Sequence, residues 1–310
     1  MKILIYGTGG VGGYFGARLA EAGNDVTFIA RGKHLKAIQK NGLQLKSIDG
    51  DYTVFPAKVT ADISSLNSDF DLILLGVKSW QILDAAKDIK PILNKKTLVL
   101  PLQNGVDNVD KLLSIIDKKH VIAGLCRIYA KVEDYGIISH FAFPPELVFG
   151  ELNNEKTNRI LAIKSVFEKA KFKAVIPVDI ITDIWKKFMF ICTVSGLGAL
   201  TRISIGAMVE NKETRGLLQK TVEEIVAVAI AKGINLPKNM VESMMNFIAS
   251  QPYDSTTSTQ RDIMDGRPSE LENFNGYIVS QGKKLGIETP VNSFIYNCLL
   301  PQEQIARGVK

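Results

Sequence analysis

A glycine-rich segment near the N-terminus has the residue types and spacing of a phosphate-binding turn. It consists of Gly7, Thr8, Gly9, Gly10, Val11 and Gly12. The segment follows a short apolar run and precedes a helical pattern, which is the context that gives a G-x-G-x-x-G sequence its meaning. The first glycine permits a tight turn, the second lets a pyrophosphate approach the backbone, and the third lets the helix pack on the strand. Unpaired N–H groups at the helix N-terminus favour an anion. The segment therefore predicts a dinucleotide site; the alternative is a glycine turn without a ligand.

The residue after the second predicted strand indicates which dinucleotide binds. An acid at this point would bind a ribose 2′-hydroxyl, whereas an arginine accommodates a 2′-phosphate. This chain has Arg31, with Lys33 two residues further on. The two positive charges suit a phosphate and favour NADPH over NADH as the cofactor. The alternative is a solvated basic loop.

Polar side chains follow two later strands. Lys78 comes after the apolar run LILLGV, and Asn104 comes after LVLPL with Gly105 beside it. Ligands of doubly wound sheets bind beyond the carboxyl ends of the strands, so Lys78 and Asn104 are candidates for contacts with nicotinamide, ribose or an anionic substrate. A surface charge at Lys78 and a turn or helix cap at Asn104 are the alternatives.

An enzyme that used NADPH to reduce a ketone would also need a proton donor, because the arriving hydride produces an alkoxide. In the C-terminal part, Lys187 shares a helical face with Ile191 and Ser195, at i+4 and i+8. The alternative for Lys187 is an ordinary ion pair with Asp183 one turn earlier.

A polar loop at residues 254–260 is followed by further candidates. Ser258, Asp262 and Glu270 lie in or after this loop. Loop solvation, helix capping and surface charge are their alternatives, and spacing does not choose among the three.

The elements that must position these residues form two groups. Apolar runs predict strands at residues 2–6, 25–30, 72–77, 98–102 and 173–178, and helical patterns are expected at residues 11–22, 33–41, 81–93 and 156–171. A small hairpin is expected at residues 43–59, turned by Asp49 and Gly50. The stretch 121–152 is β-rich. The alternation of strands and helices is typical of an α/β doubly wound parallel sheet of the Rossmann type.

The character of the sequence changes near residue 178. Helical patterns dominate residues 179–232, 238–250 and 271–285, with few strand signals. The prediction is a dinucleotide-binding domain at residues 1–178 and an all-helical, substrate-binding and catalytic domain at residues 179–310.

Composition limits the remaining function classes. Hydrophobic residues make up 46% and charged residues 23% of the 310 residues, which is ordinary for a globular protein. The net charge is +6, but Lys and Arg are scattered among acids, so no nucleic-acid partner is expected.

Cysteine usage and the start of the chain indicate the compartment. Cys126, Cys192 and Cys298 are widely spaced in apolar sequence, which indicates reduced core thiols and no metal site. The chain starts without a signal-peptide pattern, and the longest apolar run is too short for a bilayer, so a cytoplasmic protein without membrane association is expected.

Together these residues resemble the ketopantoate reductase family, the NADPH-dependent 2-dehydropantoate 2-reductases. The resemblance runs essentially from end to end and rests on several segments: GTGGVGGYFGARL with Arg31, VKSWQ, QNGV, VFGEL, WKKF, and STQRDIMDGRPSELENFNGYIV. It implies an N-terminal dinucleotide domain, a helical C-terminal domain and a small 2-oxo acid as substrate.

The resemblance also implies residue roles. Lys187, the second lysine of WKKF, resembles the general acid that protonates the ketone oxygen. Glu270 matches the carboxylate that holds the terminal hydroxyl of the substrate, and Ser258 matches a serine that binds its carboxylate. Asn104 and Lys78 match residues at the substrate and the nicotinamide. The set is chemically coherent, because it pairs a cation with the developing alkoxide and donors with a carboxylate.

The sequence departs from the family pattern at two positions. Typical pantoate-forming members have asparagines one and two turns after the catalytic lysine, whereas this chain has Ile191 and Ser195. Loss of such hydrogen-bonding partners changes discrimination by about 10⁴-fold or more. A reductase of another, more apolar 2-oxo acid is therefore the alternative function, and a non-catalytic NADP-binding sensor is a third. Exposed apolar faces expected on the C-terminal helices are compatible with a homodimer.

Overall fold

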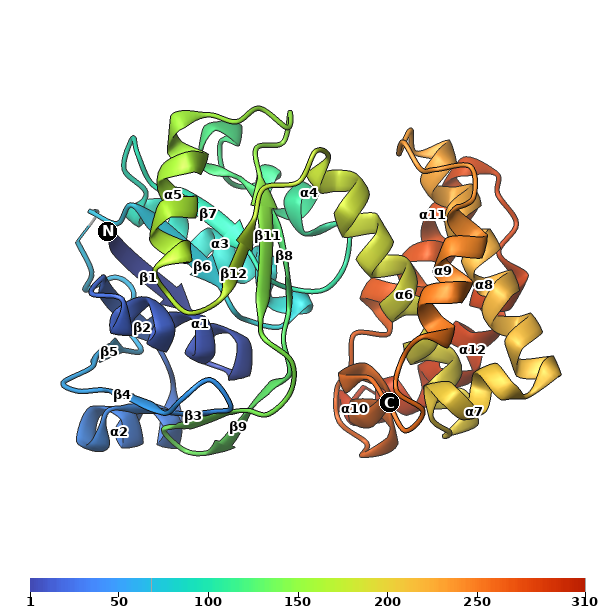
Figure 1. Ribbon diagram of the computed structural model, residues 1–310, viewed down its shortest axis with the longest axis horizontal. Helices are drawn as coiled ribbons and strands as arrows, with labels where there is room; N and C mark the ends of the chain where they lie inside the picture. The colour runs from blue at the N-terminus through green and yellow to red at the C-terminus, as the bar shows by residue number, and fades with distance from the viewer. Residues whose placement is uncertain (68, 310) are drawn as a thin grey trace. The chain divides into compact units, whose positions relative to one another are not determined.

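The computed structural model describes residues 1–67 and 69–309 (Figure 1). The chain folds as two compact units, one ending at Ile180 and the other beginning at Ile181. The division falls in the first turn of α6 (Ile180–Thr201), two residues beyond the boundary expected from sequence. Within the described residues, no helix has the length and apolar character needed to cross a membrane.

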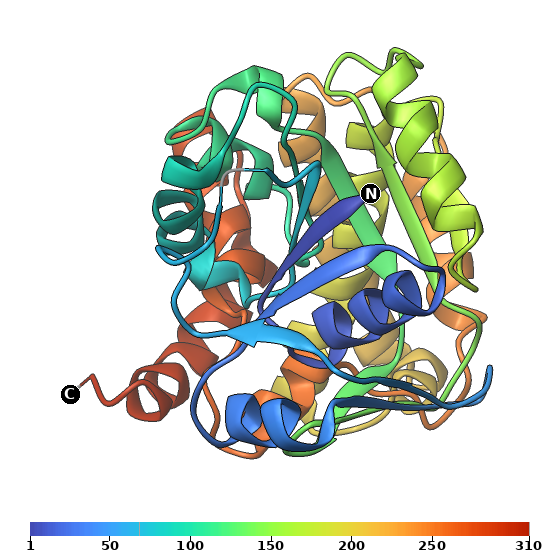
Figure 2. The same ribbon diagram turned by 90° about the vertical axis from the view of Figure 1, so that its left-hand side faces the viewer.

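A five-stranded parallel sheet forms the centre of the first unit (Figures 1 and 2). In spatial order its strands are β5 (Lys58–Thr60), β2 (Asp25–Ile29), β1 (Lys2–Tyr6), β6 (Leu72–Leu75) and β7 (Leu98–Pro101). The helices of the unit are α1 (Gly10–Glu21), α2 (Gly32–Asn41), α3 (Ile82–Ile89), α4 (Asn108–Leu113) and α5 (Asn158–Glu168). Because the strand order reverses between β1 and β6, the sheet has the switch point of a doubly wound fold.

The side chains of β1 alternate between two apolar cores. Ile3 and Ile5 pack in the cluster on the α1 side of the sheet, and Leu4 and Tyr6 pack in the cluster on the α3 side. This burial on both faces explains the nearly continuous apolar run in the sequence of a central parallel strand.

Two smaller sheets complete the first unit. One contains β4 (Tyr52–Val54), β3 (Leu43–Ser47), β10 (Ile137–His140) and β9 (Ala130–Asp134), and packs across α1. The other contains β12 (Lys173–Val175), β11 (Glu146–Gly150) and β8 (Ala123–Arg127). The expected hairpin is confirmed for β3 and β4, but its last part is wrong, because β5 pairs with β2 in the central sheet. Pro56, between β4 and β5, has no amide hydrogen with which to continue the hairpin ladder.

The second unit is helical, as expected. Its helices are α6, α7 (Ile205–Glu210), α8 (Lys212–Ala231), α9 (Met240–Ala249), α10 (Ser258–Met264), α11 (Tyr277–Leu285) and α12 (Pro290–Ala306). Ser204 and Asn211 cap α7 and α8 through their side chains and thereby divide the long helical pattern. Sequence patterns did not indicate α12.

One cysteine prediction is wrong. Cys126 and Cys192 are buried, but Cys298 is exposed on α12. The buried positions of that helix include Asn292, Ile295 and Leu299, and Cys298 lies off this stripe.

Candidate active site

The glycine turn has the geometry that its sequence predicts. Gly7 has a φ of +102°, and a Cβ atom there would lie 2.8 Å from Val77. A Cβ atom on Gly12 would collide with the carbonyl oxygen of Gly7. At Gly9, by contrast, no described atom other than those of its chain neighbours lies within 4 Å of the Cβ position. The turn is therefore closed around Gly7 and Gly12 and open at Gly9, where a pyrophosphate would approach.

The other residues of the turn hold it in place. The Thr8 amide and hydroxyl both donate hydrogen bonds to the carbonyl oxygen of Ile29, at 3.1 and 2.9 Å. The backbone of Gly10 lies against Ala130 of β9, and a Cβ atom there would be 2.6 Å from the Ala130 oxygen. Val11 packs at the edge of the core. Since the first turn of α1 carries no acidic residue, the helix N-terminus remains suited to an anion.

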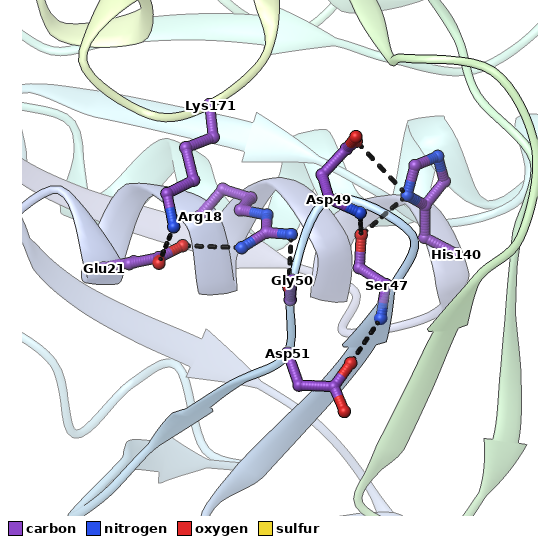
Figure 3. A network of polar contacts seen from close by, with 8 residues as sticks. All are labelled: Arg18, Glu21, Ser47, Asp49, Gly50, Asp51, His140 and Lys171. Carbon is purple, nitrogen blue, oxygen red and sulfur yellow. Dashed lines mark hydrogen bonds and ion pairs between the residues drawn. The ribbon is translucent and has the colours of Figure 1, made fainter.

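A buried arginine anchors the distal half of α1 (Figure 3). Arg18, 0% exposed, donates to Glu21 at 2.6 Å and to the carbonyl oxygen of Gly50 at 2.7 Å. Glu21 also accepts from Lys171. Burial would raise the pKa of Glu21, but the hydrogen bonds from Lys171 and Arg18 outweigh it, so the pKa lies below its ordinary value. These contacts join α1 to the β3–β4 turn and to the segment before β12.

A buried histidine lies next to this anchor (Figure 3). His140 Nε2 donates to the carbonyl oxygen of Phe143 at 3.1 Å, and Nδ1 forms a hydrogen bond with the Ser47 hydroxyl at 2.8 Å, with Asp49 Oδ2 3.8 Å away. The Ser47 oxygen in turn accepts from the Asp49 amide at 3.1 Å. The contacts fix the β3–β4 turn that receives Arg18.

The basic residues expected to bind a 2′-phosphate follow β2. Arg31 is exposed at the N-cap position of α2, and Lys33 is exposed in its first turn, with Nζ 5.7 Å from the centre of the Tyr135 ring. Beside them, His34 Nδ1 accepts from the Gly136 amide at 3.0 Å. Burial lowers the pKa of His34, which favours the neutral ring that this acceptor role requires.

The strand register brings the predicted edge residues of the first unit together. Tyr6 at the end of β1 is paired with Ile29 and Leu75, and Leu75 with Pro101. The segments with Gly7–Gly12, Arg31, Lys78 and Asn104 leave the sheet directly after these aligned strand ends, so they lie along one edge.

Within that edge, Lys78 and Asn104 sit in ordered turns. Lys78 is exposed before a 3₁₀ turn, and its backbone amide donates to Gln81 at 3.2 Å. Asn104 is half-buried, and the N-cap of α4 is Asp107, so the helix-cap alternative for Asn104 is wrong.

Gln103, next to Asn104, is a further polar residue at this edge, to which the sequence pattern assigned no role. Gln103 Nε2 donates to the Leu75 carbonyl at 2.7 Å, and its buried Oε1 has no hydrogen-bond partner among the described residues. Its position two residues after the end of β7 was the available signal. An unpaired acceptor at the same edge as the open glycine turn fits a ligand with N–H or O–H donors.

In the helical unit, Lys187 lies half-buried on α6. Asp183, its alternative partner, forms an ion pair with Lys186 at 3.4 Å. Further along the helix, Ser195 is 0% exposed, and its hydroxyl has no hydrogen-bond partner among the described residues. Ile191, which lies between Lys187 and Ser195 in the sequence, is half-buried.

The candidates around the polar loop have separate environments. Ser258 is exposed as the first residue of α10, whose N-cap is Thr257. Asp262 forms an ion pair with Arg267 at 2.9 Å. Glu270 is only 5% exposed, so the surface-charge alternative for it is wrong.

A continuous helical segment that begins with a π-helical turn starts two residues after Glu270. The turn spans Glu272–Gly276 and continues into α11. The Gly276 amide donates to the Leu271 oxygen at 3.1 Å, the five-residue spacing of a π-turn. Such turns are rare and occur often at functional sites. Among the described residues, no three His, Cys, Asp or Glu side chains gather as a metal site.

The two units define a class of protein in which a Rossmann-type parallel sheet with a glycine turn precedes an all-helical unit. Comparison with known proteins narrows this class. The profile of the ketopantoate reductase PanE/ApbA family matches residues 3–154, and its C-terminal profile matches residues 179–303. The chain therefore belongs to the ketopantoate reductase PanE/ApbA family of oxidoreductases.

Relatives extend over the whole chain. The uncharacterized oxidoreductase YkpB of Bacillus subtilis is 31% identical, with 96% of this chain and 97% of the relative covered. A 2-dehydropantoate 2-reductase of Pyrococcus abyssi is 30% identical, with 98% and 99% covered. Among solved structures, the PanE/ApbA family ketopantoate reductase of Ralstonia eutropha has a TM-score of 0.90 at 31% identity, covering 99% of this chain and 100% of that one.

Proposed function

We propose that this protein reduces 2-dehydropantoate to pantoate with NADPH. The observation that carries the proposal is the family match over both parts of the chain, with Lys187 and Glu270 both inside the C-terminal match at residues 179–303. Relatives named 2-dehydropantoate 2-reductase support it. We expect the reaction in the cytoplasm, as a step of pantothenate and coenzyme A biosynthesis.

The first unit is proposed to bind the cofactor. The open backbone at Gly9 and the acid-free N-terminus of α1 suit a pyrophosphate, and Arg31 with Lys33 suits a 2′-phosphate. Lys78 and Asn104, at the same sheet edge, are proposed to contact the nicotinamide end and the substrate. The reaction needs a hydride, which NADPH supplies when it is bound.

The helical unit is proposed to bind the substrate and supply the proton. Lys187 would donate its Nζ proton to the ketone oxygen as negative charge develops there. The Glu270 carboxylate would accept the terminal hydroxyl of the substrate, and the Ser258 hydroxyl would donate to the substrate carboxylate. Ser195 offers a further buried hydroxyl on the α6 face of Lys187.

A second function is favoured by the environment of α6. Ile191 is apolar, and Ser195 is buried with an unpaired hydroxyl. These two residues stand where the family resemblance leads one to expect asparagines, and a substrate that makes no hydrogen bond at the position of Ile191 would fit better. Reduction of another small 2-oxo acid is the alternative.

A substrate panel tests both proposals. The purified protein is mixed with NADPH or NADH and with 2-dehydropantoate, pyruvate, 2-oxoisovalerate or phenylpyruvate, and cofactor oxidation is followed by absorbance. The proposal expects the highest kcat/KM for 2-dehydropantoate with NADPH. Faster turnover of another 2-oxo acid would replace it with the alternative, and no oxidation with any acid would contradict both.

A further inference from the structure

The segment before Glu270 is held by a buried carboxylate from α12. Glu303 is 3% exposed, and both of its oxygens accept the Ser269 amide at 3.1 Å. The Ser269 hydroxyl also donates to Glu303. Because these two residues are 34 positions apart, the contact joins two distant parts of the helical unit.

An arginine completes this arrangement. Arg307, the C-cap residue of α12, donates from Nε to Glu303 at 2.6 Å and from Nη2 to the Ser269 carbonyl oxygen at 2.8 Å. The amide, hydroxyl and carbonyl of Ser269 are therefore all bound by the pair. A buried carboxylate is costly unless it is paired and hydrogen-bonded, and here it has both kinds of partner.

The fixed serine constrains the backbone on both sides of Glu270. The Ser269 hydroxyl oxygen accepts from the Leu271 amide at 3.2 Å, so the residue after Glu270 is bound to the residue before it. The Glu270 carbonyl oxygen accepts from the Phe274 amide at 3.0 Å, which ties it to the π-turn. Little backbone freedom remains at Glu270.

We propose that Glu303, together with Arg307, is a positioning residue that holds Glu270 in the orientation needed to bind the substrate hydroxyl. This inference rests on the proposed function, because Glu270 is taken to accept that hydroxyl. Glu303 acts through Ser269 and does not touch the substrate. A small displacement of a hydrogen-bonding group is costly in rate, since binding geometry must be held closely.

The test compares two substrates that differ by one hydroxyl. Trimethylpyruvate has the carbon skeleton of 2-dehydropantoate without its terminal hydroxyl. Steady-state kcat/KM with NADPH is measured for both acids with the wild type, Glu303→Gln and Glu270→Gln. Glu272→Gln is the matched control, because Glu272 lies two residues after Glu270 but is exposed and bound by the Tyr296 hydroxyl at 2.6 Å.

Glutamine at 303 retains one acceptor oxygen and places an amide group against donors. We expect Glu303→Gln to lower kcat/KM for 2-dehydropantoate about tenfold or more, mainly through KM, and to leave trimethylpyruvate unchanged. Glu270→Gln should likewise remove the preference for 2-dehydropantoate over trimethylpyruvate, and Glu272→Gln should keep that preference. Circular dichroism melting reports whether each variant is folded. Ser269→Ala, a smaller change that removes only the hydroxyl link, should act in the same direction if Glu303→Gln does not fold.

The outcomes separate the inference from the proposed function. Equal losses for both acids in Glu303→Gln and Ser269→Ala, or no loss, would overturn the positioning role. A hydroxyl preference that Glu270→Gln removes and Glu303→Gln retains would also overturn it, with the proposed function intact. A wild type that reduces both acids equally would overturn the role of Glu270 and the inference together.

Discussion

The glycine turn of the first unit and the Glu270 segment of the helical unit are held in different ways. The turn is closed within its own six-residue motif, where Gly12 packs on Gly7, and it is also bound to Ile29 through Thr8. Ser269, beside Glu270, is held by Glu303 and Arg307 from the end of the chain. The close approach of Gly7 and Gly12 within a short motif thus closes the predicted cofactor turn, whereas long-range contacts hold the backbone beside the predicted substrate carboxylate.

Gly12→Ala is expected to disrupt the glycine turn most strongly. Its Cβ atom would meet the Gly7 carbonyl oxygen, a backbone atom that cannot move aside easily. We expect the free energy of unfolding to fall by about 1–3 kcal/mol or more. The urea unfolding midpoint measures this.

Gly9→Ala is the matched control, because a Cβ atom at Gly9 has no described neighbour within 4 Å. It should leave the urea midpoint unchanged and weaken NADPH binding at least about tenfold, since the added methyl group occupies the approach of the pyrophosphate. Equal midpoints for Gly12→Ala and wild type would show that close packing does not shape the turn.

Arg31, just after β2, carries positive charge where a 2′-phosphate is expected. Arg31→Ala should weaken NADPH binding about ten- to hundredfold and leave NADH binding unchanged, since charged hydrogen bonds contribute about 1.5–3 kcal/mol. Fluorescence titration with both cofactors gives the ratio of their two dissociation constants. Lys40→Ala, an exposed basic residue at the far end of α2, should not alter the ratio. An unaltered ratio in Arg31→Ala would remove the structural reason for preferring NADPH.

The smallest effect is expected at the distal anchor of α1. The pKa of Glu21 is lowered in the fold, so its stabilisation is complete above the ordinary pKa of 4.5 and is lost as pH falls through the lower folded value. Glu21→Gln should therefore be less stable than wild type at pH 7, and the difference should shrink below about pH 4.

Urea midpoints between pH 7 and pH 3.5 follow this difference. Glu168→Gln, at an exposed carboxylate on α5, should show a smaller effect. A difference for Glu21→Gln that stays constant over this range would contradict the role assigned to its charge.

The sequence allowed the central sheet and the first half of the candidate site to be predicted because their signals are local. Gly7, Gly9 and Gly12 lie in one motif, and Arg31 follows a recognisable strand. Parallel strands in register then bring their ends to one edge. The use of the Thr8 hydroxyl on Ile29 could not be foreseen, because it depends on how β1 and β2 pair.

The second half was less predictable because its contacts are distant in sequence. The family resemblance was needed to single out Glu270 among the candidates near the polar loop. The contacts of Glu303 with Ser269 come from α12, which no pattern indicated. The i, i+4 spacing of Glu303 and Arg307 was visible but is typical of surface ion pairs. The polar loop expected at residues 254–260 includes the N-cap Thr257 and the first residues of α10, because serine and threonine occur both in loops and at helix N-termini.

Substitution of Lys187 tests the central claim most directly. Lys187→Ala is compared with Lys186→Ala, whose lysine pairs with Asp183, by fluorescence titration of NADPH and by NADPH oxidation with 2-dehydropantoate. We predict that Lys187→Ala binds NADPH like the wild type and loses about 10²- to 10⁴-fold in kcat, as expected for removal of a general acid, while Lys186→Ala keeps its turnover. Unchanged turnover in Lys187→Ala would contradict the assignment of the proton donor.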